Sequence, residues 1–548
     1  MKRIALFCAA LAVAAYAAGP DWLAYVEYGP GESVFTVAAT DATVVFELER
    51  GCLVTADEAA LAGLAPTLGV RRLDANPAGK HYMYVVTLRG PLPALDEFGT
   101  VLHRAYRDEG EESVEAAVLL TDEARAERLA GLPVELARID LQPVHISWKE
   151  AGIPPVPSVN DSLLWDLVNA VSQDTVESFI QRLQDFRTRL STTDSCRAAI
   201  QWVAQRLEAY GCDTVFEFPF RPGYAPNAIG IRYGKLNPQR IYSIGGHADA
   251  ITYTQPQLTA PGADDNASGT AAVLEAARVY QDMEFENTVY FMAFSGEEQG
   301  LYGSDSFAKY CRNRGDSIMA MLNFDMISYG RENRDSLNVY GQSSNPNATW
   351  LADFYIAHAD TFTALKIRRI IRSTLDANSD HASFLKQGFH AMMAIERDFT
   401  PKYHTIGDTI GPLYYANCGT NNLPLATNTI RAAVASLARL AGASPLTGLA
   451  EGSVPSRAAG LVEVRPSVGV DGFRVRLTAP ARPGSRLRVY NATGRLVRSL
   501  DIAGRAEAEW DGRDEAGRQA AAGSYLFRLT DGRRTTSLRA ILTGTGRQ

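Results

Sequence analysis

The order of apolar and polar positions changes twice along the chain, which predicts three folded regions. In residues 19–150, runs that alternate apolar with polar side chains predict strands, and acidic stretches with helical spacing predict helices. The alternating runs are Ser33–Val37, Thr43–Leu48 and His81–Leu88, and the acidic stretches are Asp108–Glu115 and Thr121–Leu129. We therefore expect a small α+β domain that ends at a Pro-rich linker, Ile153–Pro157.

The central region, residues 158–443, alternates helical periodicity with buried strands. The helical segments are Asp161–Leu190, Arg197–Tyr210 and Thr270–Tyr280, and the strands are Arg240–Ile244, Thr288–Phe294, Ala320–Met326 and Ala391–Ile395. This alternation is typical of an α/β fold, in which helices sandwich a largely parallel, mixed sheet. Ligands bind beyond the carboxyl ends of the strands in such sheets.

A second change in composition occurs near residue 444. Residues 444–462 are rich in Gly, Ala, Ser and Pro, which is typical of a linker. Short strands separated by turns that contain Gly follow; they are Leu487–Tyr490, Leu496–Leu500, Ala506–Trp510 and Ser524–Leu529. Residues 463–548 are therefore expected to form an all-β sandwich.

The first 18 residues have the pattern of a signal peptide. Lys2 and Arg3 precede an apolar run from Ile4 to Ala18 that ends in small residues. A membrane anchor is the alternative, but the run is shorter than the roughly 20 residues of a spanning helix. No later stretch is long and apolar enough to span a membrane, so we expect a secreted protein that is extracellular, periplasmic or attached to the cell surface.

Length and charge narrow the classes of function. A chain of 548 residues is several times the usual length of one domain, which agrees with three folded regions. The net charge of -8 disfavours nucleic acid and anionic membrane surfaces as partners.

Export would permit disulfides, and five cysteines follow the predicted signal peptide: Cys52, Cys196, Cys212, Cys311 and Cys418. Cys196 and Cys212 are close in sequence, but a helix between them would hold them roughly 24 Å apart. A disulfide tolerates at most about 7 Å between Cα atoms, so these two are not expected to pair. The odd number leaves at least one thiol free or paired between chains.

Five candidate metal ligands lie where an α/β sheet places its site. Three follow or end successive central strands, one lies in a Gly-flanked turn before a helix, and one follows the fourth strand. In chain order they are His247, Asp265, Glu298, Asp325 and His404. Each alone has an ordinary explanation, such as a helix N-cap for an Asp. Together they indicate a metal centre, because imidazole and carboxylate are ligands that zinc accepts.

Neighbouring residues supply the remaining chemistry. Two histidines and three carboxylates suffice for two ions if a single Asp bridges them. Glu297 is the spare carboxylate beside Glu298, and we predict that it takes the proton from water and delivers it to the leaving amine. Asp249 is predicted to accept the second N–H of His247, and Tyr403 to donate to the oxyanion.

With these motifs the chain resembles the di-zinc exopeptidases, which include secreted bacterial leucyl and general aminopeptidases, plasma glutamate carboxypeptidase and glutaminyl cyclase. The resemblance covers roughly Leu163 to Leu440. It rests on GGHAD at 245–249, PGADDNASGT at 261–270, FSGEEQGLYGS at 294–304, NFDM at 323–326 and YHT at 403–405.

The resemblance implies two zinc ions. One would be held by Glu298 and His404, the other by His247 and Asp325, and Asp265 would bridge them.

Two further features of this region follow. The bridging Asp of relatives begins a cis peptide bond, which corresponds here to Asp265-Asn266. Asp380 and His381 are also of metal-binding type, but the set of five is complete without them, and a cap or a position behind the ligands is the better interpretation.

The terminal regions suggest roles beyond catalysis. The C-terminal region resembles immunoglobulin-like domains related to flagellar-hook capping and type IX sorting domains, in the segments Val489–Arg495, Trp510–Gly517 and Ala522–Tyr525. The resemblance implies contact with secretion or surface-attachment machinery, and a passive stabilising module is the alternative. Residues 19–150 are interpreted as a propeptide that shields the site or assists folding, or as a permanent domain.

We expect from these residues a secreted di-zinc aminopeptidase that hydrolyses peptides with a free N-terminus. Carboxypeptidase and glutaminyl cyclase share the scaffold. Five ligands favour a two-metal hydrolase over the one-zinc cyclase, and no Arg-rich carboxylate clamp is evident for a carboxypeptidase. A non-catalytic surface binding protein is the alternative from another class. The presence of Glu297, the predicted general base, disfavours it.

Overall fold

The computed structural model describes residues 22–446 and 461–542, apart from short gaps at 88–90, 109–112, 147–153, 155, 332–334, 344–346, 375–378, 412–417, 466–467, 470–471, 478–480, 482–484, 492–495, 522 and 532–533. The predicted signal peptide and parts of both predicted linkers lie outside the described residues. The chain divides into two compact units, Met1–Leu446 and Thr447–Gln548, and each is described by itself.

Two antiparallel sheets form the N-terminal part of the first unit, residues 22–146, called here the N-terminal domain. Its strands are β1 (Trp22–Glu27), β2 (Thr43–Leu48), β3 (Gly51–Ala56), β4 (Gly69–Ala75), β5 (His81–Thr87), β6 (Thr100–Asp108), β7 (Ser113–Thr121) and β8 (Val134–Ile139). Its helices are α1 (Val34–Ala38), α2 (Glu58–Leu64) and α3 (Glu123–Leu129). The strand orders are β2-β3-β1-β4 and β6-β7-β5-β8, so β8 is an edge strand.

Two segments of this domain differ from the prediction. The prediction of a strand at Ser33–Val37 is wrong, because its two valines are spaced by three residues and are both buried on one side of helix α1. The prediction of a helix at Asp108–Glu115 is also wrong. Strands β6 and β7 pair with Asp108 opposite Ser113, so strand pairing overrides the local preference of the acidic residues.

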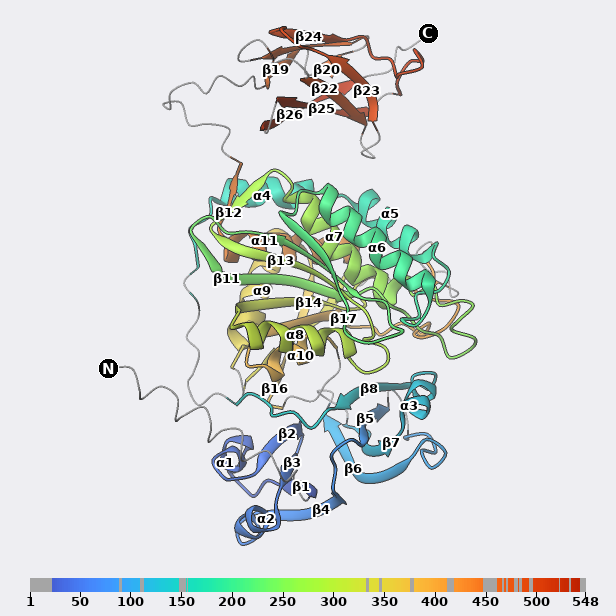
Figure 1. The fold of residues 1–548 in the computed structure, drawn as a ribbon, viewed down its shortest axis with the longest axis vertical. Helices are drawn as coiled ribbons and strands as arrows, with labels where there is room; N and C mark the ends of the chain where they lie inside the picture. Colours follow the sequence, from blue (N-terminus) through green and yellow to red (C-terminus); the bar gives the residue numbers. More distant parts are fainter. Residues whose placement is uncertain are drawn as a thin grey trace, which may run out of the picture. The chain divides into compact units, whose positions relative to one another are not determined.

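A mixed sheet of eight strands forms the core of the central region (Figure 1). The strands are β9 (Thr214–Phe218), β10 (Asn227–Arg232), β11 (Asn237–His247), β13 (Asn287–Phe294), β14 (Ser317–Phe324), β15 (Ser336–Gln342), β16 (Lys366–Arg372) and β17 (Ala391–Glu396). Their order is β16-β15-β17-β14-β11-β13-β10-β9. The neighbours β17, β14, β11 and β13 run parallel, and the flanking pairs β15/β17 and β10/β13 are antiparallel. The predicted α/β fold is confirmed.

Helices cover both faces of this sheet (Figure 1). They are α4 (Asp161–Ala170), α5 (Gln173–Gln184), α6 (Asp194–Ala209), α7 (Gly269–Val279), α8 (Tyr302–Arg314), α9 (Thr349–Phe362), α10 (His381–Lys386) and α11 (Leu423–Ala441). Phe291 and Ala293 of β13 pack with the layer that includes α7 and α11, whereas Met292 and Phe294 pack with the layer of α8 and α10. Because both faces are buried, the strand is apolar from Val289 to Phe294 rather than alternating.

The single helix predicted over Asp161–Leu190 is two helices in the structure. Ser172 interrupts it, and its hydroxyl accepts a hydrogen bond from the N–H of Thr175 at the start of α5. The short strands β12 (Met283–Phe285) and β18 (Ala443–Pro445) pair with each other beside the main sheet.

The second unit contains two small sheets with a common core. Its strands are β19 (Leu461–Arg465), β20 (Val468–Gly469), β21 (Phe473–Leu477), β22 (Arg486–Asn491), β23 (Leu496–Asp501), β24 (Glu507–Trp510), β25 (Gly523–Asp531) and β26 (Arg534–Leu542). The orders are β19-β21-β24 and β20-β26-β25-β22-β23. Trp510 is fully buried between side chains of both sheets, including Phe473 and Phe527. This part is all β, as predicted.

The five described cysteines are all free, and Cys196 and Cys212 do not pair, as predicted. Among the described residues, we find no helix with the length and apolar character that a membrane crossing requires.

One buried arginine joins three segments that meet at the end of β11. The side chain of Arg189 is fully buried. Its Nε donates to the carbonyl of Ala248 at 2.7 Å, and its two Nη atoms donate to the carbonyls of Pro261 and Gly262 at 2.5 and 2.6 Å. The rigid fork of the guanidinium therefore fixes the end of β11 relative to the turn before α7.

Replacing Arg189 by methionine is expected to lower the free energy of unfolding by at least about 3 kcal/mol. Three buried carbonyl groups lose their donor, and each unsatisfied group costs about 1–3 kcal/mol. Denaturant unfolding followed by tryptophan fluorescence measures the change. Arg369→Met is the matched control, because Arg369 pairs with Asp353 at the surface, where an ion pair contributes about 0–1 kcal/mol. Equal losses in the two variants would contradict the role of Arg189.

Candidate metal centre

The five predicted ligands converge at the carboxyl ends of the parallel strands. His247 is the last residue of β11, Asp325 directly follows β14, and Glu298 follows β13. Asp265 lies in η2 (Ala263–Ser268), an irregular turn before α7, and His404 lies in the loop after β17. Because β11 lies between β14 and β13 in the sheet, His247 is flanked by the ligands of both neighbours.

Uncommon backbone conformations shape these loops. Leu301, Met326 and His404 have φ angles of 64°, 51° and 52°. Residues other than glycine seldom adopt such angles, and those that do concentrate at functional sites. Gly262 has φ 50°, and a Cβ atom there would lie 2.4 Å from the carbonyl oxygen of Asp265, so the turn requires glycine. The Asp265-Asn266 peptide bond is cis, as the resemblance suggested.

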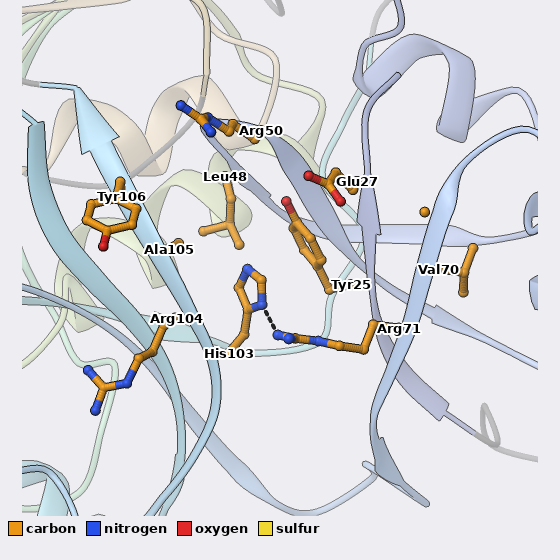
Figure 2. A pocket seen from close by; sticks show the side chains of 11 residues that line it. Tyr25, Glu27, Leu48, Arg50, Val70, Arg71, His103, Arg104, Ala105 and Tyr106 are labelled. Carbon is orange, nitrogen blue, oxygen red and sulfur yellow. Dashed lines mark hydrogen bonds between the residues drawn. The ribbon is translucent and has the colours of Figure 1, made fainter. Parts of the chain in front are cut away.

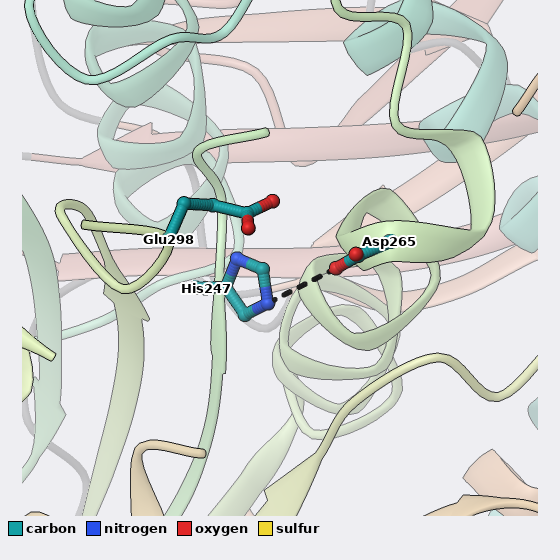
Figure 3. A group of neighbouring side chains, drawn as sticks. All are labelled: His247, Asp265 and Glu298. Carbon is teal, nitrogen blue, oxygen red and sulfur yellow. Dashed lines mark ion pairs between the residues drawn. The ribbon is translucent and has the colours of Figure 1, made fainter. Parts of the chain in front are cut away.

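The geometry assigns the two oxygens of Asp265 to different imidazoles. His404 Nε2 lies 2.7 Å from Glu298 Oε2 and 3.2 Å from Asp265 Oδ2. His247 Nε2 lies 3.3 Å from Asp265 Oδ1 and 3.3 Å from Asp325 Oδ1. Figure 3 shows His247, Asp265 and Glu298 pointing toward one another. Each imidazole therefore has one carboxylate of its own and shares Asp265 with the other.

Some of these buried atoms lack a hydrogen-bond partner. Asp265 Oδ2 and His404 Nε2 are within ion-pair distance, at 3.2 Å, yet neither has the geometry of a hydrogen bond with a described residue. Buried polar atoms without partners are costly, so a convergent group of them indicates a ligand that the protein itself does not supply. Two imidazole nitrogens and three carboxylates are a donor set that suits zinc.

The charges of the cluster favour bound cations. Burial raises the pKa of Glu297 well above its ordinary value, and burial together with Asp265 raises the pKa of Glu298 to about 7. Burial opposes protonation of His404, but Glu298 and Asp265 raise its pKa to about 10. Nearby positive charge would therefore stabilise the ionised carboxylates, and divalent cations supply it at neutral pH.

Glu297 lies beside the cluster but is neither of the two carboxylates closest to each imidazole. Its Oε2 is 3.8 Å from His247 Nε2. The described side chains contain two groups suited to a metal ion, His247 with Asp265 and Glu298, and His247 with Glu297 and Asp325. Glu297 therefore belongs to one of these groups and lies close to the candidate ligands.

Comparisons with known proteins agree with this geometry. The model of peptidase family M28 matches residues 227–424, which contain all five ligands. A probable leucine aminopeptidase of Arthroderma benhamiae is 30% identical over 259 residues, which cover 45% of this chain and 70% of the relative. The chain belongs to peptidase family M28.

Other matches extend this result. A probable zinc metalloprotease of Pyrenophora tritici-repentis is 29% identical over 322 residues, which cover 48% of this chain and 65% of the relative. The crystal structure of LapB from Legionella pneumophila has the same fold as this M28 chain, with a TM-score of 0.51, 18% identity and coverage of 66% of this chain and 99% of LapB. The model of the FlgD Ig-like domain matches residues 464–534.

Asp249 supports the M28 site mainly through the loop of Glu297. Its backbone carbonyl, rather than its carboxylate, accepts a hydrogen bond from His247 Nδ1, at 3.2 Å, and its Oδ1 lies 3.5 Å from the same nitrogen. The carboxylate accepts from Ser191 Oγ at 2.7 Å and from the backbone N–H groups of Glu297 and Glu298 at 3.4 and 3.3 Å. Asp249 therefore faces His247 Nδ1 with its carboxylate at ion-pair distance, as predicted, and with its carbonyl at the shorter distance.

Two supporting residues were not identified from the sequence. Asp408 accepts hydrogen bonds from the backbone N–H groups of Asp264 and Asp265 at 2.9 and 3.0 Å. Ser379 Oγ donates to Asp325 Oδ2 at 2.7 Å. Both lie in loops without periodicity, and the only signal for Ser379 is its position next to a segment of metal-binding type.

The Asp380 and His381 side chains belong to neither group of metal-binding side chains among the described residues. Asp380 lies at the N-cap of α10 without a capping hydrogen bond from its side chain. The neighbouring Ser379 lies behind a candidate ligand, because its hydroxyl donates to Asp325. This agrees with the interpretation that the segment lies behind the ligands.

Tyr403 lies against the imidazole of His404. The two rings stack with a centroid distance of 3.7 Å and an interplanar angle of 17°. Burial and the charges of Asp265 and Glu298 raise the pKa of Tyr403 well above its ordinary value. The phenol therefore keeps its proton and can act as a hydrogen-bond donor.

The ligands line a small cavity of about 40 Å³. Its apolar lining comes from Met326, Ile395 and Phe399, and β8 of the N-terminal domain contributes Val134, Glu135 and Leu136. The lining residues in the described part of the chain include neither Lys nor Arg.

A separate cavity of about 380 Å³ lies between the two sheets of the N-terminal domain (Figure 2). Arg50, Arg71 and Arg104 contribute to its lining, and the guanidinium of Arg71 contacts the ring of His103. It shares no lining residue with the metal cavity, so it is not part of the M28 site.

Removing the metal with a chelator is expected to lower the thermal unfolding midpoint by roughly 5–10 °C, because the buried carboxylates lose their counter-charge and ligand binding no longer stabilises the fold. Added zinc should restore the midpoint. Differential scanning calorimetry of the purified protein measures both steps. The Asp265→Asn variant should respond less, since its bridge is weakened, and a midpoint that is indifferent to chelator would contradict a metal centre here.

Proposed function

We propose that this M28 peptidase is a secreted aminopeptidase that works with two zinc ions. The observation that carries the proposal is the division of the Asp265 carboxylate between two imidazoles, each with its own second carboxylate. The names of the relatives, leucine aminopeptidase and zinc metalloprotease, support the activity and the metal.

The ligand set divides into two sites that share one carboxylate. Glu298, His404 and Asp265 Oδ2 would hold one ion, and His247, Asp325 and Asp265 Oδ1 the other. Bound zinc supplies Lewis acidity, which polarises the peptide carbonyl and lowers the pKa of water.

Glu297 is the proton carrier in this proposal. Its carboxylate lies 3.8 Å from His247 Nε2, and the five proposed ligands complete both sites without it. It would accept the proton of the attacking water and pass it to the amine that leaves when the peptide bond breaks. Tyr403, which keeps its phenolic proton, would donate to the oxyanion.

The charge of the cavity favours an aminopeptidase over a carboxypeptidase. Glu135, Glu297 and the ligand carboxylates line it, and its described lining has no Lys or Arg. A free α-ammonium group is attracted by carboxylates, whereas a C-terminal carboxylate would need a cationic partner. Met326, Ile395 and Phe399 would receive an apolar side chain of the first residue.

Secretion and surface attachment belong to the same proposal. Lys2, Arg3 and the apolar run that follows support export through a signal peptide, which lies outside the described residues. The FlgD Ig-like match at residues 464–534 supports a terminal module for sorting or attachment.

The Glu297→Gln variant is expected to keep two zinc ions and to lose about 10²–10⁴-fold in kcat on leucine p-nitroanilide, because a positioned general base contributes that much. Wild type should prefer leucine over aspartate p-nitroanilide and should ignore substrates blocked at the amine. Zinc analysis and steady-state kinetics, before and after cleavage between residues 146 and 156, measure these properties.

The matched control is Glu208→Gln, because Glu208 is exposed on α6. Its kcat should equal that of wild type. Zinc-loaded wild type that is no faster than Glu297→Gln on any substrate would favour the non-catalytic binding protein, and release of C-terminal residues would favour the carboxypeptidase.

A further inference from the structure

The second unit, Thr447–Gln548, differs in charge from the rest of the chain. It contains 17 arginines, no lysine and 10 acidic residues, which gives it a net charge of +7. Because the whole chain carries -8, the residues before it carry -15. The net charge of the chain therefore conceals a cationic unit whose positive side chains are all guanidinium groups.

On the three-stranded sheet of this unit, exposed arginines are balanced by glutamates. Arg474 and Arg476 of β21 are exposed and alternate with buried apolar residues. Arg474 lies opposite Glu509 of β24, and Arg476 lies opposite Glu507, and both glutamates are exposed. Opposite charges that face each other across adjacent strands stabilise a sheet. The outer face of this sheet is therefore balanced in charge along β21 and β24.

The five-stranded sheet has no such balance on its outer face. Arg486 and Arg488 of β22 are exposed and alternate with buried apolar residues. Arg488 lies opposite Arg528 of β25, which is also exposed, and opposite Ser499 of β23 on the other side. Like charges directly opposite each other destabilise a sheet. The arrangement therefore has a cost in stability unless an anion lies against it.

Little negative charge is available nearby to offset these arginines. Asp501, on the edge strand β23, lies opposite Arg486, and its Oδ1 accepts a hydrogen bond from the N–H of Ala503 at 3.0 Å. Within the part of the chain that the structure describes, the side chains of Arg488 and Arg528 have neither an ion pair nor a hydrogen bond. Their guanidinium donors are therefore directed to solvent or to a partner.

Apolar side chains continue the same face beyond the arginines. Tyr490 follows Arg488 by two residues on β22 and lies opposite Leu526 of β25 and Leu496 of β23. Tyr490 and Leu526 are half-buried, and Leu496 is 42% exposed. We call this surface the arginine face; it consists of Arg486, Arg488, Tyr490, Leu496, Leu526 and Arg528. A cationic part beside tyrosine and leucine is typical of proteins that lie on the interface of a membrane.

We propose that the arginine face binds an anionic lipid surface through the phosphate groups of the lipids. Guanidinium groups donate to phosphate oxygens in pairs, which would relieve the repulsion between Arg488 and Arg528. Tyr490 and Leu496 would contact the apolar layer below the headgroups. An acidic polypeptide would match the charge but is less suited to the apolar part. The proposal rests on the export and surface attachment in the proposed function, and it is independent of hydrolysis.

The test measures sedimentation of the full-length protein with lipid vesicles at low salt. One set of vesicles contains equal parts of phosphatidylglycerol and phosphatidylcholine, and the other contains phosphatidylcholine alone. The Arg488→Gln/Arg528→Gln variant removes two charges from the arginine face. The matched control, Arg474→Gln/Arg476→Gln, removes two charges from the balanced sheet. Thermal unfolding and hydrolysis of leucine p-nitroanilide are measured for all three proteins.

We expect wild type to bind the anionic vesicles and to bind them less at high salt, because salt screens the charges. The Arg488→Gln/Arg528→Gln variant should bind about tenfold or more weakly, since each basic residue near an anionic surface contributes to binding. The control should bind as wild type does. The variant of the arginine face should unfold at the same temperature as wild type or higher, because it loses a pair of like charges.

A second variant tests the apolar part of the arginine face. Leu496→Ser should weaken binding to the anionic vesicles and leave binding to soluble polyglutamate unchanged, because only the lipid surface offers an apolar layer. Wild type that binds polyglutamate but not the vesicles would overturn the lipid surface in favour of an acidic protein.

Other outcomes would also overturn the proposal. Equal losses in the two double variants would show an effect of net charge alone, and equal binding to both kinds of vesicle would show that phosphatidylglycerol is not recognised. Hydrolysis separates this proposal from the proposed activity. Vesicle binding without hydrolysis would support the lipid surface and reject the aminopeptidase, whereas hydrolysis without vesicle binding would reject only the lipid surface.

Discussion

The gathering of four carboxylates around two imidazoles is the constraint on which the rest of the structure depends. Asp265, Glu298 and Asp325 are buried, the half-buried Glu297 lies beside them, and a low-dielectric interior does not tolerate that much negative charge alone. The pKa values of Glu297 and His404 are both raised, which means that each group holds its proton more tightly in this negatively charged region. Two divalent cations would satisfy it and would turn the cluster into a catalyst.

The surrounding fold serves to hold these charges against their mutual repulsion. The three carboxylate ligands are each fixed by a group behind them: Ser379 holds Asp325, Asp408 holds the backbone of Asp265, and Asp249 holds the loop of Glu298. Such hydrogen bonds orient the ligands before a metal binds, so less order has to be created on binding. Strand β8 of the N-terminal domain also contributes Val134, Glu135 and Leu136 to the wall of the cavity.

The sequence predicted the convergence of the five candidate ligands because a parallel sheet brings the ends of its strands together. Once His247 and Asp325 were placed at strand ends, their proximity followed from topology alone. Asp408 and Ser379 could not be found in this way, because a loop residue gains its role only from the tertiary position of its loop. The same limit applies to Glu135, which lies more than a hundred residues before the first ligand.

Local patterns failed where tertiary contacts outweighed them. The valines of Ser33–Val37 favour a strand by propensity, yet burial of one side makes the segment helical. The acidic stretch Asp108–Glu115 favours a helix, yet its described residues, Asp108 and Ser113–Glu115, belong to the paired strands β6 and β7. The cavity wall depends on such long-range contacts as well, so the residues that β8 contributes to it could not be located from the sequence.

The most direct test of the metal centre is anomalous X-ray diffraction at the zinc edge from crystals of the full-length protein grown with zinc. The account predicts two peaks roughly 3.5–4 Å apart. One should lie among His404, Glu298 and Asp265, and the other among His247, Asp325 and Asp265. A single peak, or peaks away from Asp265, would contradict it.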